Sequence, residues 1–400
     1  MAIARGIAEA MRAGSWIRRM FERGREMKAR LGPDAVFDLS LGNPLLEPPK
    51  EFQQALREIS SEAPAGRHRY MTNAGFPEVR QAVADHLART GLMHTDAGHV
   101  VMCCGAGGGL NIALKALLDP GDEVLVLAPY FVEYLYYISN HGGRPVVLQT
   151  DETFLPDPAA LAGALNEKTK ILLINSPNNP TGRVYPAELL KDLSGMLEAH
   201  ARRTGREVWV LSDEPYREML HAGGTAPSIA TVYPRTLQVY SWSKSLSIPG
   251  ERIGYVAVDP AAPGADELFD GLVFATRILG FINAPGILQR AAASLLKVPV
   301  DMGPYRTKRE RVLKGLKAAG YEMIDPEAAF YVFPKAPGGD DVAFCERAMD
   351  EEQVLVVPGA GFGRPGHFRL AFCADDRVID EGLKRLGRMA EKLKNRGQTA

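Results

Sequence analysis

The fold is indicated most clearly by KILLINSPNNPTG at residues 170–182, together with REVWVLSDEPY at residues 206–216. Each segment starts with a continuous, β-branched apolar run and ends in Asn, Asp or Pro. This pattern is typical of a strand that is buried on both faces of a parallel sheet. Residues 185–203, between the two segments, have the spacing of a helix. A strand, a helix and a second strand in this order predict parallel strands joined by a crossover helix.

The same alternation extends in both directions, from about residue 99 to residue 259. The predicted strands are HVVMCC, DEVLVLAP, RPVVLQT, KILLINSP, REVWVLSDEP, TLQVYSWS and RIGYVAV. Further helices are expected at 107–118, 131–142 and 157–165. We therefore predict an α/β fold in which residues 49–300 form a large domain. Its core is a mainly parallel seven-stranded sheet flanked by helices.

Beyond residue 300 the pattern changes to a smaller α+β unit. A charged helix is predicted at 301–319 and another helix near 341–351, with the short apolar runs AFYVFPKA, VLVVPG and HFRLAFC as strands. We expect the small domain to combine residues 301–400 with part of an N-terminal arm, residues 1–48. The first segment is arginine-rich like a transit peptide, but its acidic residues favour an ordinary helix or arm.

Composition argues against several classes of partner. Lys and Arg number 47 against 48 Asp and Glu, so the chain has no basic excess to attract nucleic acid or an anionic membrane. No apolar run approaches the length of a membrane span. The four cysteines have neither disulfide-framework nor zinc spacing. They are expected to be reduced thiols in a cytoplasmic protein, and no metal site is predicted.

The candidate functional residues follow the predicted strands, where open α/β sheets bind their ligands. In CCGAGGGLNIAL (103–114) a strand ends and three glycines open a helix, so free backbone N–H groups could bind a phosphate. A merely flexible turn is the alternative. A literal G-x-G-x-x-G pattern ending at Gly366 is rejected as a dinucleotide site, because a strand follows it rather than a helix.

Two charged side chains at the same edge point to cofactor chemistry. Asp213 follows the buried run VWVL and needs either a partner, such as a helix cap or ion pair, or a functional role. Lys244 follows another strand; burial and nearby Arg252 would lower its pKa and favour the nucleophilic amine, unless it is simply a solvated loop lysine. A reactive lysine, a phosphate site and an acid partner together are what pyridoxal phosphate requires.

These segments resemble the fold-type I pyridoxal-phosphate enzymes, specifically the class I/II aminotransferases of the aspartate aminotransferase kind. The resemblance rests on SWSKSLSIPGERIG (241–254), DEPY (213–216) and NNPTG (178–182). It extends from DLSLGNP (38–44) to HFRLAF (367–372). The resemblance implies a homodimeric aminotransferase that uses pyridoxal 5'-phosphate and moves an amino group between an α-amino acid and a 2-oxo acid by a ping-pong mechanism.

The resemblance also implies roles for individual residues. Lys244 would form the Schiff base and shuttle a proton, and Asp213 would pair with the ring nitrogen. Tyr216 and Asn179 would bind the ring's phenolic oxygen, and Phe131 would stack on the ring. The phosphate would be held by Ser241, Arg252 and the backbone of Ala106, Gly107 and Gly108, with Tyr70 donated from the partner subunit. The substrate would be bound by Arg369 at its α-carboxylate and by the loop of Gly42 and Asn43, with Asn179 also in contact.

The sequence departs from the family pattern in two places. The phosphate loop has Ala106-Gly107-Gly108 where many members have a hydroxyl residue. Ile278 stands where dicarboxylate-specific dimers have a second arginine, with Arg277 beside it, which weakens a preference for aspartate or glutamate. A β-lyase that cleaves C–S bonds, or another pyridoxal-phosphate reaction on this scaffold, is the alternative function. A non-catalytic sensor fused to a DNA-binding domain is disfavoured, because only about 35 residues precede the DLSLGNP segment.

Overall fold

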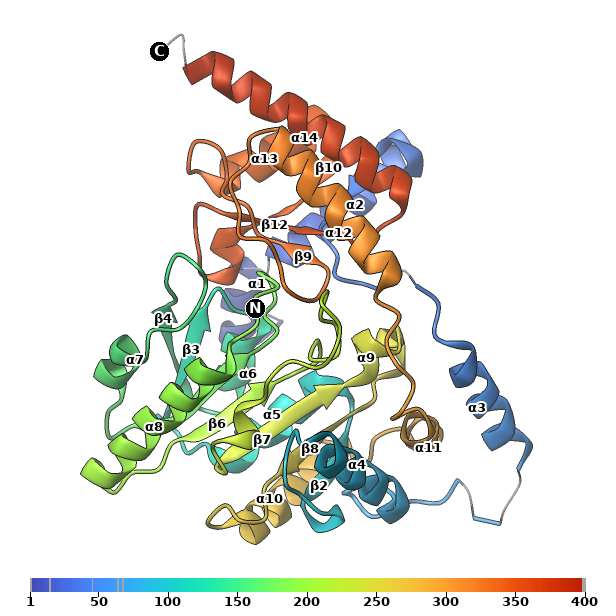
Figure 1. Ribbon diagram of the computed structural model, residues 1–400, viewed down its shortest axis with the longest axis vertical. Helices are drawn as coiled ribbons and strands as arrows, with labels where there is room; N and C mark the ends of the chain where they lie inside the picture. The colour runs from blue at the N-terminus through green and yellow to red at the C-terminus, as the bar shows by residue number, and fades with distance from the viewer. Residues whose placement is uncertain (1, 14–15, 45, 63–64, 67, 398–400) are drawn as a thin grey trace.

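The computed structural model describes residues 2–13, 16–44, 46–62, 65–66 and 68–397. Within them a seven-stranded sheet has the strand order β2-β8-β7-β6-β5-β3-β4 (Figure 1). The strands are β2 (Val100–Cys103), β3 (Glu123–Ala128), β4 (Arg144–Gln149), β5 (Thr169–Asn175), β6 (Trp209–Asp213), β7 (Thr236–Ser241) and β8 (Gly254–Val258). All pairs are parallel except those of β8, which runs antiparallel to β2 and β7. The predicted α/β fold is confirmed, and each predicted apolar run contributes one strand.

Helices cover both faces of this sheet because successive strand residues point to opposite sides. On one face, Val126 and Leu173 pack with α5 (Gly105–Leu117), α6 (Glu133–Asn140) and α10 (Ala265–Ile278). On the other face, Leu125 and Leu172 pack with α7 (Pro158–Ala164) and α8 (Ala187–Thr204). Farther along that face lie α3 (Lys50–Ser61), α4 (Pro77–Thr90) and α11 (Gly286–Ser294). Only the edge strand β4 departs from the predicted continuous burial, since its residues are half-buried or exposed.

A second group of elements lies above the carboxyl edge of the large sheet (Figure 1). It contains a parallel pair, β1 (Phe37–Asp38) with β10 (Val354–Leu355). It also contains an antiparallel sheet of β11 (Val357–Pro358), β12 (Phe368–Ala371) and β9 (Tyr331–Val332). The helices here are α2 (Trp16–Leu31), α12 (Gly303–Ala318), α13 (Asp341–Glu352) and α14 (Asp376–Gly397), and α1 (Arg5–Ala13) precedes α2 in the chain. The pairing of β1 with β10 joins the N-terminal segment to the C-terminal one.

Two close backbone approaches shape the turn that follows β7. The short helix α9 (Trp242–Ser245) continues from β7, and Ser241 caps it by accepting a hydrogen bond from the Ser243 N–H. Gly254, at the start of β8, passes so close to the carbonyl of Tyr240 that a Cβ atom would collide with it. Glycine is therefore required where β8 crosses the end of β7. In the described ranges, none of the helices is long and apolar enough to span a membrane.

Candidate active site

A pocket of about 270 Å³ lies beyond the carboxyl ends of β5, β6 and β7. Its walls come from the large sheet, from the amino end of α5, from the loop after β1 and from β9 and β12. The predicted site residues that line it are Gly42, Ala106, Gly107, Phe131, Asn179, Asp213, Tyr216, Ser241, Lys244, Arg252 and Arg369. The structure therefore gathers side chains that lie up to several hundred residues apart in the sequence around one cavity.

Lys244 presents its amine to this pocket. Its Nζ atom donates a hydrogen bond of 2.7 Å to the carbonyl of Gly42. Burial lowers the pKa of Lys244 to about 8; the Cys373 thiol acts in the opposite direction, and the charges of Arg369 and Arg252 lower the pKa further. The lowering of the Lys244 pKa agrees with the expectation from the sequence, although burial and Arg369 contribute more to it than Arg252 does. Because its pKa is lowered, a larger fraction of this amine is neutral near physiological pH than for an exposed lysine, which favours its use as a nucleophile.

Asp213 is buried at the end of β6 with one of its oxygens unpaired. The hydroxyl of Tyr134 donates to Oδ2 at 2.5 Å, whereas Oδ1 is inaccessible and has no partner among the described residues. Burial raises the pKa of Asp213 to about 7; the Tyr134 bond lowers it and the Glu214 carboxylate raises it. Asn175 donates to the Asp213 backbone carbonyl at 2.9 Å and fixes the turn. An unpaired buried carboxylate oxygen fits a cationic N–H donor such as a protonated pyridine ring.

An anion site lies at the amino end of α5. The helix begins at Gly105, so its first backbone N–H groups have no intrahelical acceptor. Gly105 has φ 68, and a Cβ atom there would lie 2.8 Å from Nη2 of Arg252. The guanidinium therefore lies directly over the helix terminus, with Ser241 lining the same pocket. Free N–H groups, a hydroxyl and a guanidinium fit a phosphate group.

Arg369 supplies a second positive charge from β12. Its Nη1 donates to Oδ1 of Asn179 at 2.9 Å and its Nη2 to the carbonyl of Ser40 at 2.5 Å. The Nε atom is buried without a partner, and no described carboxylate forms an ion pair with the guanidinium. Burial lowers the pKa of Arg369, with the Tyr331 hydroxyl acting in the opposite direction. A buried guanidinium without a carboxylate fits an anionic ligand.

Several predicted residues lie outside the pocket walls. Tyr70 is 90% exposed and does not reach the pocket of its own chain. Asn43 is exposed beside Gly42, and Gly108 is buried inside α5. Arg277 is exposed on α10, 5.0 Å from the ring of Phe274.

The structure also reveals site residues that the sequence analysis missed. Tyr134 follows Phe131 by one helical turn, so the spacing in PYFVEY could have revealed it. Asn175 ends β5 and could have been found by the same edge argument as Asp213. Tyr331, whose hydroxyl pairs with that of Tyr216 at 2.9 Å, comes from the second group of elements and carries no local signal.

Comparisons with known proteins agree with this geometry. Residues 34–386 match the family model "Aminotransferase class I and II". The aspartate/prephenate aminotransferase of Thermus thermophilus is 32% identical over 375 residues, covering 90% of this chain and 92% of that protein. An amino transferase structure from Eubacterium rectale has a TM-score of 0.93 at 36% identity, covering 98% of this chain and 99% of that one. The aspartate aminotransferase of Thermus thermophilus with maleate has a TM-score of 0.86 at 29% identity, covering 97% and 100%.

The chain belongs to the class I and II aminotransferases, of fold-type I. It is a pyridoxal-phosphate-dependent transaminase that moves an amino group between an α-amino acid and a 2-oxo acid. The alternative of a C–S β-lyase is not favoured, because the matching family and the relatives named above are aminotransferases.

Proposed function

We propose that the pocket beyond β5, β6 and β7 is the site of amino transfer. The observation that carries the proposal is the meeting of an amine with a lowered pKa, an unpaired buried carboxylate oxygen and two guanidinium groups in one cavity. Two of these four groups, Asp213 and Arg369, are buried with one polar atom unpaired, which a ligand bound in the pocket would explain.

The residues present fit pyridoxal 5'-phosphate. Arg252, Ser241 and the N–H groups at the start of α5 would hold the phosphate, and Asp213 Oδ1 would accept from the ring nitrogen. Phe131 lines the pocket and would pack on the ring, while Tyr216 and Asn179 would bind its phenolic oxygen. When bound, the cofactor supplies an electron-accepting ring and a carbon that carries the amino group.

Each protein group would then have a defined task. Arg369 would bind the substrate's α-carboxylate with a two-pronged contact. Lys244 would move a proton at the substrate's α-carbon, which its lowered pKa permits near neutral pH. Asp213 would keep the proton on the ring nitrogen. After the first product leaves, the same groups would act on the 2-oxo acid in the reverse order, which gives ping-pong kinetics.

The test of this assignment is Lys244→Ala. The variant should lose the visible absorbance of the bound cofactor and the half reaction with an amino acid. Lys115→Ala, at an exposed position on α5, is the matched control and should retain both. Wild-type turnover in the Lys244 variant would refute the assignment.

We further propose that the preferred amino acid has an uncharged side chain. The cations that line the pocket in the described residues are Lys244, Arg252 and Arg369, and each already has a task. A second carboxylate, as in aspartate, would have no counter-charge from this chain. Half reactions with the twenty amino acids would test this idea. Faster reaction with aspartate than with alanine, lost selectively in Arg277→Ala, would instead assign Arg277 to a second carboxylate.

We also propose that the active form is a homodimer in which each chain donates Tyr70 to the phosphate site of its partner. The 90% exposure of this tyrosine supports the idea, since a large hydroxyl-bearing ring is left uncovered in the single chain. Tyr70→Phe should then weaken cofactor binding without changing the dimer mass in sedimentation experiments.

Residues 49–300 are proposed as the large domain and residues 1–48 with 301–400 as the small one, which the pairing of β1 with β10 supports.

A further inference from the structure

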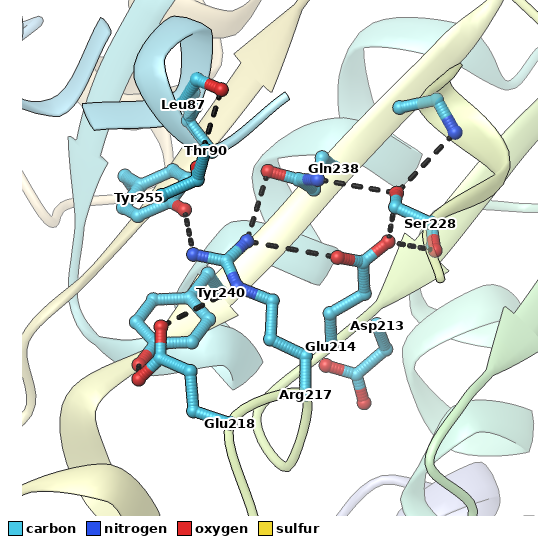
Figure 2. Close-up of polar contacts among 12 residues, drawn as sticks. Leu87, Thr90, Asp213, Glu214, Arg217, Glu218, Ser228, Gln238, Tyr240 and Tyr255 are labelled. Atoms are coloured by element: carbon cyan, nitrogen blue, oxygen red, sulfur yellow. Dashed lines mark hydrogen bonds and ion pairs between the residues drawn. The ribbon is translucent and has the colours of Figure 1, made fainter. Parts of the chain in front are cut away.

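Directly behind the proposed site, on the opposite face of the sheet, lies a buried charged cluster centred on Arg217 (Figure 2). Its Nη1 donates to Oε1 of Gln238 at 3.1 Å and its Nη2 to the hydroxyl of Tyr255 at 2.7 Å. Nη1 also lies 3.6 Å from the Glu214 carboxylate, and both side chains are only 2% exposed. The aminotransferase reaction does not by itself require a buried arginine at this place.

The cluster connects the two turns that carry the reactive groups. One turn follows β6, whose last residue is Asp213, and it contains Glu214, Arg217 and Glu218. The guanidinium carbon of Arg217 stacks 4.1 Å from the centre of the Tyr240 ring. The Tyr240 hydroxyl donates to Glu218 at 2.9 Å and pairs with the Ser245 hydroxyl at 2.7 Å.

Ser245 is the residue after Lys244, so a chain of side-chain contacts runs from the Asp213 turn to the Lys244 turn. A backbone hydrogen bond of 2.9 Å from the Glu214 N–H to the Val239 carbonyl reinforces the connection. The two turns leave adjacent paired strands, with Asp213 opposite Val239, and the cluster adds a side-chain connection behind that pairing.

The charges of the cluster depend on one another. Glu214 accepts hydrogen bonds from Ser212 at 2.7 Å and from Ser228 at 2.6 Å, and its other oxygen faces Arg217. Burial raises the pKa of Glu214, and the Arg217 charge counters that effect. Removing one partner of a buried pair leaves the other charge uncompensated, which the surrounding structure must relax to accommodate.

We propose that Arg217 is a positioning residue that sets the placement of Asp213 relative to Lys244 by joining their two turns behind the sheet. The proposal rests on the function proposed for the pocket. Relaxation of the cluster would move Asp213 and Lys244 relative to each other while leaving each side chain in the pocket. Misplacement of reacting groups by a fraction of an ångström to 1 Å lowers rates by about 10- to 100-fold.

The test compares wild-type holoenzyme with Arg217→Met and Arg217→Lys. The visible circular dichroism of the bound cofactor reports how its ring is held, and equilibrium dialysis gives its dissociation constant. We expect Arg217→Met to change the dichroic band, to weaken cofactor binding about tenfold and to lower kcat about 10- to 100-fold with little change in KM. Arg217→Lys keeps the positive charge, so its dichroic band, cofactor affinity and kcat should lie between those of Arg217→Met and the wild type.

A matched control is Arg235→Met, directly before the amino end of β7. Arg235 pairs with Glu198 at 3.1 Å and with Glu207, far from the pocket edge. This variant should lose stability but keep the wild-type dichroic band and kcat. If Arg217→Met behaves like Arg235→Met in all measurements, Arg217 is only structural and the proposal is wrong.

Two further comparisons keep the outcome unambiguous. If Arg217→Met does not fold, Tyr255→Phe takes its place, because it removes one hydrogen-bond acceptor of the Arg217 guanidinium. This variant should change the dichroic band and lower kcat, by less than expected for Arg217→Met. Wild-type values of both in Tyr255→Phe would overturn the proposal. A wild-type protein that shows no visible cofactor band would instead refute the function proposed for the pocket.

Discussion

Replacing Lys244 with methionine is expected to stabilise the cofactor-free protein at neutral pH while it abolishes activity. The pKa of Lys244 is lowered from 10.5 to about 8, chiefly by burial. Because one pH unit corresponds to about 1.4 kcal/mol, keeping this amine protonated in the folded state at pH 7 costs about 3 kcal/mol. Methionine has a similar length and carries no charge.

Two effects reduce the gain in stability expected for Lys244→Met. Methionine leaves the Gly42 carbonyl without the hydrogen bond from Nζ, which is worth about 1 kcal/mol. Lys244 is also only partly buried in the cofactor-free pocket, so water screens some of its charge. We therefore expect Lys244→Met to raise the free energy of unfolding by about 1–2 kcal/mol at pH 7.

The stability advantage of Lys244→Met over the wild type should disappear at higher pH. Between about pH 8 and pH 10.5 the unfolded chain holds the Lys244 proton and the folded chain does not, so wild-type stability rises with pH in that window. At pH 9.5 the wild type should have recovered about 2 kcal/mol relative to the variant, which removes the difference.

Urea unfolding of both cofactor-free proteins, at one protein concentration and at pH 7 and pH 9.5, measures the effect. Lys115→Met, at an exposed position, should match the wild type at both pH values. If Lys244→Met is no more stable than the wild type at pH 7, or if it is still more stable at pH 9.5, then burial of the protonated Lys244 amine does not destabilise the folded protein by this amount.

Three other substitutions test the remaining parts of the site. Asp213→Asn should raise the cofactor dissociation constant about 10- to 100-fold by equilibrium dialysis, because a neutral amide makes a weaker bond to a charged donor; unchanged binding would disprove the pairing with Oδ1. Arg369→Lys should raise KM for the amino acid about tenfold in steady-state kinetics and leave cofactor affinity intact, whereas an equal loss of both would indicate a general disruption. Gly42→Ala places a methyl group against the Tyr331 hydroxyl, so thermal unfolding should show a loss of about 1–3 kcal/mol together with lower activity; full stability would mean that the loop moves freely.

The prediction of the large sheet succeeded because its strands are specified locally. Runs such as VWVL and ILLI are too apolar to be exposed and too short for helices, and the following Asp213 and Asn175 mark the edge where parallel strands end. The edge strand β4 was the exception. Its β-branched residues have the same local pattern, but no neighbouring strand covers its outer side.

The sequence by itself determined the α/β fold and, through the residues at the strand ends and the family motifs, the chemistry of the pocket. Only the tertiary structure decided which distant groups complete that pocket. Arg369 reaches Asn179 and Ser40 across 190 and 329 positions, and Tyr331 meets Tyr216 across 115. Likewise, the sequence shows Arg217 as one more charged residue beside a turn, and its burial depends on Gln238, Tyr240 and Tyr255 from two other strands. Local patterns specify whether a segment is a strand or a helix, whereas contacts between segments depend on how those elements pack.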